Sequence, residues 1–384
     1  MSRKRLVILT EIIAPYRIPV FNAIAKQSDV DLHVIFLSET DLSLRQWHVY
    51  KNEIRFSYEV LPAWRRRLGR YNMLLNSGVG AALRAARPDA VLCGGYNYFA
   101  AWQAAFWCRR HSVPLLLWSE STGQDVRHGF GPVEFAKIRF CGLCRAFVAA
   151  GTTSRDYLRV LGAEEGSIFV APDAVDNDLY SSSAEKARQC ADEVRARHGL
   201  PDRYFLCVTR LVKEKGVFDL LAAYSKLDES TRSQIGLVFA GDGSARAELV
   251  QQAASIVPGT IKFCGWVHRE QVPEIYALAE ALVFPTHSDP WGLVVNEAMA
   301  CGLPVIASSV AGCVPDLVED SWNGFVVGPR DVDGLARAMR KLLMDSSLAR
   351  EMRVHSLERI QEFSPQACAE GIVRAAMFAC ERSQ

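Results

Sequence analysis

The sequence lacks the features of several protein classes. No apolar run reaches 18 residues, so no transmembrane helix is predicted. The apolar run Leu6–Leu9 follows basic residues as in a signal peptide, but Glu11 interrupts it and no small-residue cleavage site follows, so we expect a buried first strand. The 11 cysteines include a single Cys-x-x-Cys pair, Cys141 and Cys144, without a nearby pair of histidines. We therefore expect no metal site, and reduced thiols in the cytoplasm.

The sequence also lacks a complete dinucleotide-binding fingerprint. Gly241 and Gly243 follow an apolar run, but Arg246 stands where a third glycine is required. The loop after the first predicted strand, residues 10–19, contains no glycine. A hydride-transferring dehydrogenase is therefore disfavoured, and no cofactor is expected. Internal repeats and low-complexity tracts are absent as well.

The chain has enough apolar sequence for two domains. It is 384 residues long and 49% apolar, which is long for one domain and typical of a globular protein. In the first 170 residues, continuous apolar runs alternate with amphipathic stretches, a pattern typical of parallel strands buried on both faces. Ligands of such sheets bind at the carboxyl ends of the strands. The predicted strands are Leu6–Leu9, Leu32–Leu37, Ala90–Cys93, Leu115–Trp118 and Ala146–Ala150, and the predicted helices are Pro19–Lys26, Val79–Arg87 and Ala100–Arg110.

The net charge of +1 conceals two halves of opposite sign. Residues 1–161 contain 22 Lys+Arg against 12 Asp+Glu, a balance of +10, whereas residues 162–384 contain 22 against 31, a balance of −9. A basic half suits an anionic acceptor, an anionic lipid surface or nucleic acid. The stacking aromatics of a nucleic-acid module are missing, so no nucleic-acid partner is expected. Basic residues are densest in Trp64–Arg70, for which a solvated loop and a membrane-docking segment are alternative interpretations.

The stretch Asp289–Ser308 is the most informative part of the chain. Its pattern predicts a loop, a helix and a strand that follow an earlier strand, which together make one βαβ unit. Asp289 is the predicted N-cap, Pro290 the first helical residue, and Gly302 the residue that ends the helix. Glu297 lies among apolar residues of this helix, so a polar partner is expected for its carboxylate.

Asp289 and Glu297 are eight residues apart. On a helix this separation corresponds to about 12 Å along the axis and about 80° of rotation. A glycosidase needs its two carboxylates about 5 to 9.5 Å apart, so the pair is too widely spaced for that role. The spacing suits a ligand with an anionic middle and a hydroxylated part, such as a nucleotide sugar. The structural alternative is that Asp289 only caps the helix and Glu297 pairs with a neighbouring Arg or Lys.

The sequence from Asp289 to Ile306 resembles the donor-binding motif of glycosyltransferase family 4, whose members are retaining enzymes of the GT-B fold. The family usually has Glu at both ends of a Glu-x7-Glu pattern, and Asp289 replaces the first Glu here. The resemblance implies an α/β protein with two Rossmann-like parallel-sheet domains that face a central cleft. Residues 1–175 with a C-terminal helix 364–384 are expected to bind the acceptor, and residues 176–363 are expected to bind the nucleotide sugar.

The resemblance also implies roles on the donor side. Arg210 and Lys215 follow the predicted strand Tyr204–Thr209, where cations and helix amides can hold a diphosphate; otherwise both are solvated charges. Glu297 is expected to accept hydrogen bonds from ribose hydroxyls, and Asp289 from hydroxyls of the sugar. The other residues expected near the donor are Gly241, Val267, Gly292, Leu293 and Gly312.

The acceptor-side candidates lie in two loops of the first half. Arg17 is in the first loop and is either a contact to phosphate or acceptor, or a surface arginine at a helix start. Glu120 follows a later strand, where many relatives have a His. A carboxylate there can orient the acceptor hydroxyl, or act as a base if burial raises its pKa; alternatively it pairs with Arg127 or caps the next helix. Asp125 and His128 are further candidates.

These expectations combine into one function. The chain is predicted to be a metal-independent, retaining glycosyltransferase that moves a hexosyl group from a UDP- or GDP-sugar to a glycan, lipid-linked or small-molecule acceptor in polysaccharide or glycoconjugate biosynthesis. The alternatives are a hydrolysing sugar-nucleotide epimerase of the same fold and a non-catalytic nucleotide-sugar-binding protein. We expect a cytoplasmic location, on the inner face of the cell membrane if Trp64–Arg70 binds lipid.

Overall fold

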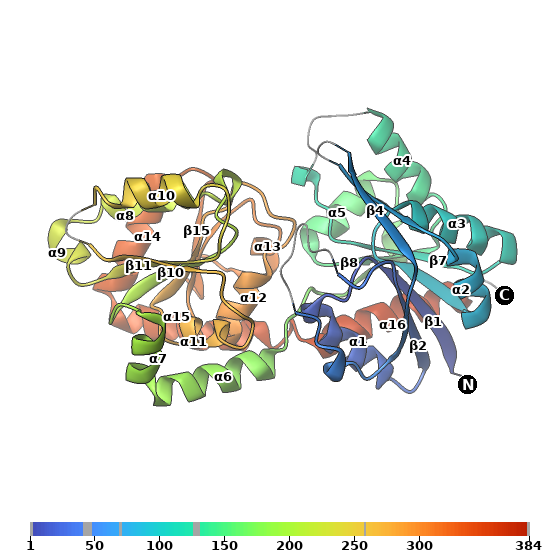
Figure 1. Cartoon of the computed structure of the whole chain (residues 1–384), viewed down its shortest axis with the longest axis horizontal. Helices are drawn as coiled ribbons and strands as arrows, with labels where there is room; N and C mark the ends of the chain where they lie inside the picture. Colours follow the sequence, from blue (N-terminus) through green and yellow to red (C-terminus); the bar gives the residue numbers. More distant parts are fainter. Residues whose placement is uncertain (1–2, 41–47, 69–70, 126–130, 257–258, 382–384) are drawn as a thin grey trace. The chain divides into compact units, whose positions relative to one another are not determined.

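The computed structural model describes residues 3–40, 48–68, 71–125, 131–256 and 259–381. The chain divides into two compact units, Met1–Val175 with Ser364–Gln384, and Asp176–Phe363. Figure 1 shows that each unit contains a sheet with helices packed on it. Within the described ranges, no helix combines the length and the apolar character needed to cross a bilayer.

The main sheet of the first unit has seven strands. They are β1 (Lys4–Thr10), β2 (Val30–Phe36), β3 (Ser57–Val60), β6 (Ala90–Cys93), β7 (Leu115–Ser119), β8 (Ala146–Ala149) and β9 (Ile168–Val170). Their order is β3-β2-β1-β6-β7-β8-β9, and every neighbouring pair is parallel. The five predicted strands all belong to this sheet, so the predicted parallel sheet is confirmed.

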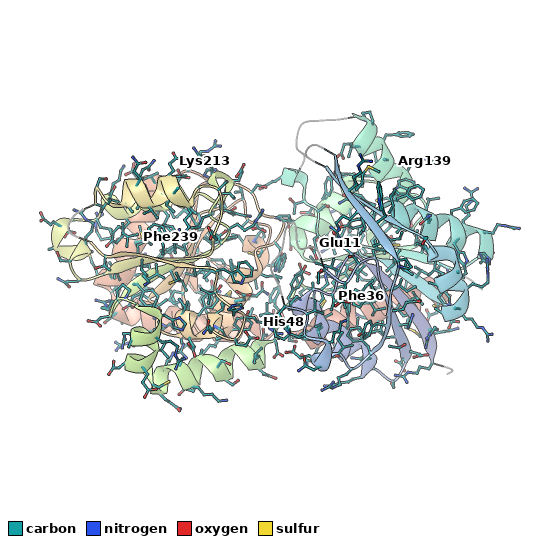
Figure 2. The ribbon with its side chains drawn as sticks, viewed as in Figure 1. Glu11, Phe36, His48, Arg139, Lys213 and Phe239 are labelled. Atoms are coloured by element: carbon teal, nitrogen blue, oxygen red, sulfur yellow. The ribbon has the colours of Figure 1, made fainter. Side chains whose placement is uncertain are left out.

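Helices cover both faces of this sheet. They are α1 (Ile18–Ala25), α2 (Val79–Ala86), α3 (Phe99–His111), α4 (Gly131–Cys141), α5 (Thr152–Val160) and α16 (Pro365–Glu381), with 3-10 turns η1 (Pro15–Arg17), η2 (Lys51–Glu53), η3 (Gly123–Asp125) and η4 (Glu165–Ser167). Leu6 and Ile8 of β1 belong to one apolar core with α1 and α16, whereas Val7 and Leu9 belong to a second core with α2, α3 and α5. Burial on both faces explains why the strand sequences are continuously apolar. Figure 2 shows Phe36, a residue of the first core, inside the unit.

The strands β4 (Ala63–Leu68) and β5 (Tyr71–Asn76) pair antiparallel as a hairpin. The solvated-loop interpretation of the basic segment is therefore wrong for residues 64–68, because they pair with β5. Gly69 and Arg70 lie outside the described residues. Trp64 is 53% exposed, whereas Arg65 forms an ion pair with Glu11 at 3.7 Å. The hairpin therefore carries both an exposed aromatic ring and a neutralised cation.

The C-terminal helix α16 belongs to the first unit, where it packs against α1, β8 and β9. Figure 1 shows the red α16 beside the blue α1. Gly371 is a point of close approach, because a Cβ atom there would overlap the carbonyl oxygen of Val170 and lie 2.8 Å from the Cβ of Ala171. The absence of a side chain lets the helix pack directly on the backbone that follows β9.

Gly371→Ala tests this close packing. Helix propensity alone favours Ala by about 1 kcal/mol, but overlap with a backbone carbonyl forces the helix outwards, and overpacking costs about 1–3 kcal/mol. We expect a net loss of about 1–2 kcal/mol in the free energy of unfolding of the first unit, measured by urea denaturation. Glu370→Ala, at an exposed position of the same helix, is the control and should change stability by less than about 0.5 kcal/mol. A more stable Gly371→Ala protein would contradict the packing.

The second unit contains a six-stranded sheet. Its strands are β10 (Tyr204–Val208), β11 (Gly236–Ala240), β12 (Ile261–Gly265), β13 (Ala281–Phe284), β14 (Val305–Ser308) and β15 (Gly324–Val327). Their order is β12-β11-β10-β13-β14-β15, and all pairs are parallel. The predicted α/β fold class with two parallel sheets is thus confirmed.

Helices also bury both faces of the second sheet. They are α6 (Asn177–Gln189), α7 (Ala191–His198), α8 (Val217–Ser225), α9 (Glu229–Arg232), α10 (Arg246–Ala253), α11 (Val272–Ala277), α12 (Leu293–Ala300), α13 (Val314–Leu317), α14 (Val332–Met344) and α15 (Ser346–Ile360), with a 3-10 turn η5 (Lys213–Lys215). Phe239 packs with α8, α10 and α14 in the interior of the unit, and Figure 2 shows Lys213 at its periphery. On the opposite face, the hydroxyl of buried Tyr204 donates a hydrogen bond to the Ile275 carbonyl of α11 at 2.6 Å.

The helix in the stretch Asp289–Ser308 begins later than predicted. α12 starts at Leu293, with Gly292 at φ 104° as its N-cap residue, and Asp289 instead forms an isolated bridge with Ala311. The predicted N-cap role of Asp289 and the helical spacing between Asp289 and Glu297 are therefore wrong. Asp289 instead pairs with Ala311 through the backbone and with Lys215 through its side chain. Gly292 allows the later start, because a Cβ there would lie 2.6 Å from the Phe284 ring and glycine adopts the left-handed φ without strain.

The end of α12 agrees with the prediction. Gly302 has φ 71°, and its amide donates to the Met299 carbonyl at 2.9 Å, while the Leu303 amide donates to the Ala298 carbonyl at 2.9 Å. This pair of bonds is a Schellman motif, which glycine favours because it needs a left-handed residue. The motif turns the chain directly into β14.

Candidate functional site

All strands of the second sheet are parallel, so the loops after β10, β11, β12, β13 and β14 gather at one edge. Backbone hydrogen bonds join these loops: the Gly241 amide donates to the Gly265 carbonyl at 2.7 Å, and the Gly312 amide donates to the Asp289 carbonyl at 3.0 Å. The residues of this edge that the sequence associates with the donor are Arg210, Lys215, Gly241, Val267, Asp289, Gly292, Leu293 and Gly312.

Lys215 and Asp289 form an ion pair at this edge. The Lys215 Nζ donates to Asp289 Oδ2 at 2.6 Å and to the Ser288 carbonyl at 3.1 Å. The side chains are only 12% and 20% exposed, so solvent screens the pair less than a surface ion pair. The second carboxylate oxygen of Asp289 accepts the Trp291 amide at 3.2 Å. The pair therefore fixes the loop after β13 against the loop after β10.

Further contacts hold the same loop in place. His287 Nε2 lies 2.5 Å from Asp219 Oδ2, and the His287 amide donates to the Glu214 carbonyl at 2.9 Å. Gly216 approaches the Pro285 carbonyl so closely that a Cβ would overlap it. His287 and Asp219 could not be predicted from the sequence, because nothing in their local pattern indicates that residues 68 positions apart meet.

Arg210 differs from Lys215 in having a free side chain. It is exposed, and in the part of the chain that the structure describes no side chain forms a hydrogen bond or ion pair with it. Val267, after β12, is half-buried, and the neighbouring Trp266 is 42% exposed. The edge therefore presents a free guanidinium at one loop and apolar surface at another.

The Glu297 carboxylate is held by two phenols. Tyr180 of α6 donates to Oε1 and Tyr276 of α11 donates to Oε2, both at 2.8 Å. Burial raises the pKa of Glu297 above its ordinary value, while the two phenols and Arg269 act to lower it. The expected polar partner exists, but its hydrogen bonds come from tyrosines that the sequence analysis missed. Tyr180 lies 117 positions away from Glu297, so no local pattern could reveal it.

Asp289 and Glu297 consequently have separate partner sets. Asp289 is paired with Lys215 in a loop, and Glu297 is bonded to two tyrosines on a helix. The helix-based estimate of their separation does not apply, because Asp289 lies outside α12. The two carboxylates therefore differ in their environment: Asp289 contacts an ammonium group, and Glu297 contacts two phenol groups.

Glu297→Gln tests the raised pKa. A carboxyl group whose pKa is higher in the folded state than in the unfolded state stabilises the fold most at pH values below its unfolded-state pKa of about 4.3. This contribution is lost as the pH rises through the folded-state pKa. The free energy of unfolding of Glu297→Gln, relative to that of wild type, should therefore increase as pH rises above about 4.3 and become constant above the folded-state pKa of Glu297. Urea unfolding from pH 4 to 8 measures it, with the exposed Glu358→Gln as control. A difference independent of pH would contradict the shift.

In the first unit, the structure brings together two acceptor-side candidates, Arg17 and Glu120. Arg17 ends η1, Glu120 follows β7, and their side chains form an ion pair. The Arg17 guanidinium lies 3.9 Å from the Trp118 ring centroid, and its side chain is 11% exposed, so the surface-arginine interpretation is wrong. Burial works against the charged guanidinium, but Glu120, Tyr16 and Asp173 outweigh it and raise the pKa of Arg17.

Asp173 is a further member of this cluster that the sequence analysis did not single out as a site residue. It follows β9 and is 5% exposed. Burial and the nearby Glu120 raise the pKa of Asp173 well above its ordinary value, while Arg17 acts to lower it. Asp125 ends η3, and His128 lies outside the described residues, as does Arg127, the alternative partner of Glu120. Within the described ranges, no group of three or more His, Cys, Asp or Glu side chains could hold a metal ion.

Comparison with known proteins gives matches in sequence and in structure. Residues 191–358 match the family model Glycosyl transferases group 1. Glycogen synthase of Mycobacterium tuberculosis is 33% identical over 278 residues, which cover 72% of this chain and 65% of that protein. O-antigen chain mannosyltransferase B of Escherichia coli is 30% identical over 176 residues, 45% of each chain. The chain thus spans about half to two thirds of the length of these curated relatives.

Solved structures match nearly the whole chain. The crystal structure of Anabaena Alr3699/HepE in complex with UDP has a TM-score of 0.76 at 19% identity and covers 96% of this chain and 98% of its own. Sucrose-phosphate synthase of Thermosynechococcus elongatus has a TM-score of 0.73 at 20% identity and covers 97% and 98%. At these identities the likeness shows the fold, which is GT-B, with two parallel-sheet α/β units. Residues 191–358, which carry Arg210, Lys215, Asp289 and Glu297, form a domain of the glycosyl transferases group 1 type.

Proposed function

We propose that the chain is a retaining hexosyltransferase of glycosyltransferase family 4 that uses a UDP- or GDP-sugar. The observation that carries this proposal is the edge of the second sheet, where the Lys215–Asp289 pair and the free cation Arg210 flank one set of loops. A nucleoside diphosphate is the leaving group of such a transfer, and fixed cations stabilise the charge that develops on it. The second unit is accordingly the donor-binding unit.

Lys215 has a defined task in this proposal. Its ammonium group has three donors, of which two are used by Asp289 and Ser288, so one remains for a phosphate oxygen. Asp289 orients Lys215 and also accepts a hydrogen bond from the sugar through its remaining lone pairs. Because Asp289 is one methylene shorter than Glu and already engaged, the proposal ties sugar choice to this residue.

Glu297 binds the ribose in this proposal. Each carboxylate oxygen accepts one phenolic hydrogen bond and keeps a lone pair for a ribose hydroxyl. The two tyrosines hold the carboxylate in place before the ligand arrives, which lowers the ordering cost of binding. Gly292, Leu293, Gly241, Val267 and Gly312 complete the donor-binding loops.

The first unit binds the acceptor in this proposal. Glu120 orients the acceptor hydroxyl or takes its proton, and Arg17 fixes the position of Glu120 through their ion pair. Asp125 and His128 remain acceptor-side candidates. The acceptor is a glycan, a lipid-linked sugar or a small molecule. The basic segment Trp64–Arg70 is a proposed membrane contact of a protein that works in the cytoplasm on polysaccharide or glycoconjugate synthesis.

The named activities of similar proteins support this class of reaction. The relatives include an O-antigen chain mannosyltransferase and a D-inositol 3-phosphate glycosyltransferase, which transfer glycosyl groups by name, and a glycogen synthase. A structure of similar fold was solved with UDP-glucose. We propose a metal-independent reaction in which Arg210 and Lys215 supply the positive charge.

Donor binding is the first test. A panel of UDP- and GDP-sugars scored by thermal shift should identify at least one nucleotide that raises the melting temperature of wild type. Arg210→Ala and Lys215→Ala should each weaken that shift and reduce turnover by about 10²-fold or more, because each removes a cation from the leaving group. Lys213→Ala is the matched control: Lys213 lies two residues from Lys215, is 70% exposed and pairs with Glu248. Near-normal turnover in both Arg210→Ala and Lys215→Ala would contradict the proposal.

A further inference from the structure

The two helices α3 and α4 lie side by side in the first unit. The ring of Trp102 on α3 meets the ring of Phe140 on α4 edge to face, with 5.1 Å between their centroids. Both helices belong to the same apolar core, on one face of the sheet (Figure 1). Because each helix connects two parallel strands, both run from the carboxyl edge of the sheet back to its amino edge. Their starts are therefore neighbours, and so are their ends.

The outward side of α3 carries large apolar side chains. Phe99 and Phe106 are 58% and 72% exposed, whereas all four alanines of the helix are buried. A helix of a globular protein ordinarily turns its large apolar residues inwards and its polar residues outwards. Phe99 and Phe106 are seven residues apart, or about two turns, so they lie on one side of the helix. The helix therefore departs from the ordinary pattern.

The outward side of α4 is similar. Phe135 and Ile138 are 66% and 49% exposed, and their separation of three residues puts them on one side of the helix. Phe140 is buried on the opposite side. We call the outward sides of both helices the α3–α4 surface, and its apolar residues are Phe99, Phe106, Phe135 and Ile138.

The other exposed residues of these helices are basic or lack a polar side chain. They are Arg109, Arg110 and His111 on α3, and Gly131, Pro132, Val133 and Arg139 on α4. Within Phe99–His111 and Gly131–Cys141, which the structure describes throughout, no exposed residue is an acid, an amide or a hydroxyl. The α3–α4 surface therefore offers no side-chain oxygen to a partner.

The surface is also positively charged. Arg109, Arg110 and Arg139 are exposed, and among the described residues no side chain forms a hydrogen bond or ion pair with any of them. α3 contains no Asp or Glu, and the one carboxylate of α4, Glu134, accepts a hydrogen bond from Lys137 at 2.7 Å. The three arginines lie in the last turns of their helices, and Figure 2 labels Arg139 on α4. They consequently gather at one end of the apolar residues.

The charge of this surface disfavours a second copy of the chain as its partner. In a two-fold symmetric dimer the same surface packs on itself. The arginines of one copy would then meet either the arginines or the apolar residues of the other, and neither contact supplies a counter-charge. Unmatched charges that lose their water in an apolar contact cost free energy. The partner must therefore be anionic.

An anionic lipid surface matches these features. Amphipathic helices at a bilayer surface insert Phe, Trp and Leu among the acyl chains and keep Lys and Arg at the level of the headgroups. Protein–protein interfaces carry about one hydrogen bond per 100–200 Å², whereas a fluid headgroup layer needs no directional match. A surface with arginines, exposed phenylalanines and no side-chain oxygen suits the lipid better than an acidic protein.

We propose that the α3–α4 surface docks the first unit on a membrane that contains anionic lipids. The four apolar residues enter the acyl region, and Arg109, Arg110 and Arg139 lie among the headgroups. This surface is different from the basic segment Trp64–Arg70. The docking does not depend on the proposed reaction, because it needs neither donor nor acceptor.

Flotation of the full chain with lipid vesicles tests the proposal. Wild type should bind vesicles of phosphatidylcholine and phosphatidylglycerol at least about tenfold more tightly than vesicles of phosphatidylcholine alone. The double variant Phe135→Ser, Ile138→Ser should bind the anionic vesicles about tenfold or more weakly, because two apolar side chains no longer enter the bilayer. The matched control is Val354→Ser, which removes a 63% exposed side chain from α15 of the second unit and should leave binding unchanged.

Three results of this experiment would overturn the proposal. They are wild type that does not bind the anionic vesicles, wild type that binds both kinds of vesicle equally, and a double variant that binds as well as wild type. The first result is also the one expected if the partner is an acidic protein. The nucleotide-induced thermal shift of the second unit should be the same in wild type and the double variant, so failure of the docking and failure of the proposed function are recognised separately.

Arg139→Gln and Phe106→Ser test charge and apolar contact separately. Arg139→Gln should weaken binding to the anionic vesicles about fivefold. Phe106→Ser, on the other helix, should weaken binding to both kinds of vesicle. Arg350→Gln, which removes an exposed arginine of α15, is the control for charge and should have no effect. The replaced side chains are exposed, so the melting temperatures should stay near that of wild type. Unchanged binding in Arg139→Gln and Phe106→Ser would contradict the assigned surface.

Two further measurements distinguish other contacts. Sedimentation velocity without lipid should give the same association state for wild type and the double variant, and a dimer that only wild type forms would overturn the proposal in favour of a second copy. Trp64→Ser removes a 53% exposed ring from the hairpin and should weaken vesicle binding less than the double variant does. The reverse order would assign the docking to Trp64–Arg70 and overturn the proposal.

Discussion

The ion pair between Lys215 and Asp289 joins two loops that lie 74 residues apart in the sequence, and the carboxyl edge of the second sheet depends on it. Parallel strands send both loops to one edge, but the ion pair, together with His287 and Asp219, sets where the loop after β13 lies. α12 begins directly after this loop, with Gly292 as its N-cap residue. Glu297 takes its place on that helix.

Both units pair a cation with a carboxylate at the carboxyl edge of the sheet. In the second unit, Lys215 is paired with Asp289 and keeps one donor, and Arg210 forms no side-chain hydrogen bond or ion pair within the described residues. In the first unit, Arg17 is paired with Glu120 and Arg65 with Glu11. In the proposed function, the cations of the second unit meet the diphosphate of the donor.

Much of the fold could be predicted from the sequence, because strands buried on both faces of a parallel sheet have continuous apolar sequences. The hairpin Ala63–Asn76 was missed because its arginines conceal the strand pattern, and the start of α12 was misplaced because Asp289 and Pro290 form a typical helix start. For the site, the βα loops and their residues could be named from local motifs. The partners of Glu297, Arg17 and Asp289 could not, since each contact joins positions far apart in the chain.

In the proposed function, Arg210 and Lys215 hold the diphosphate of a nucleotide sugar at the carboxyl edge of the second sheet. A crystal structure of the chain with UDP or GDP, whichever binds, would show this contact. We expect phosphate oxygens within hydrogen-bond distance, about 2.7–3.2 Å, of both side chains, with the ribose hydroxyls on Glu297. A diphosphate bound away from Arg210 and Lys215, with Lys215 still bonded only to Asp289 and Ser288, would contradict it.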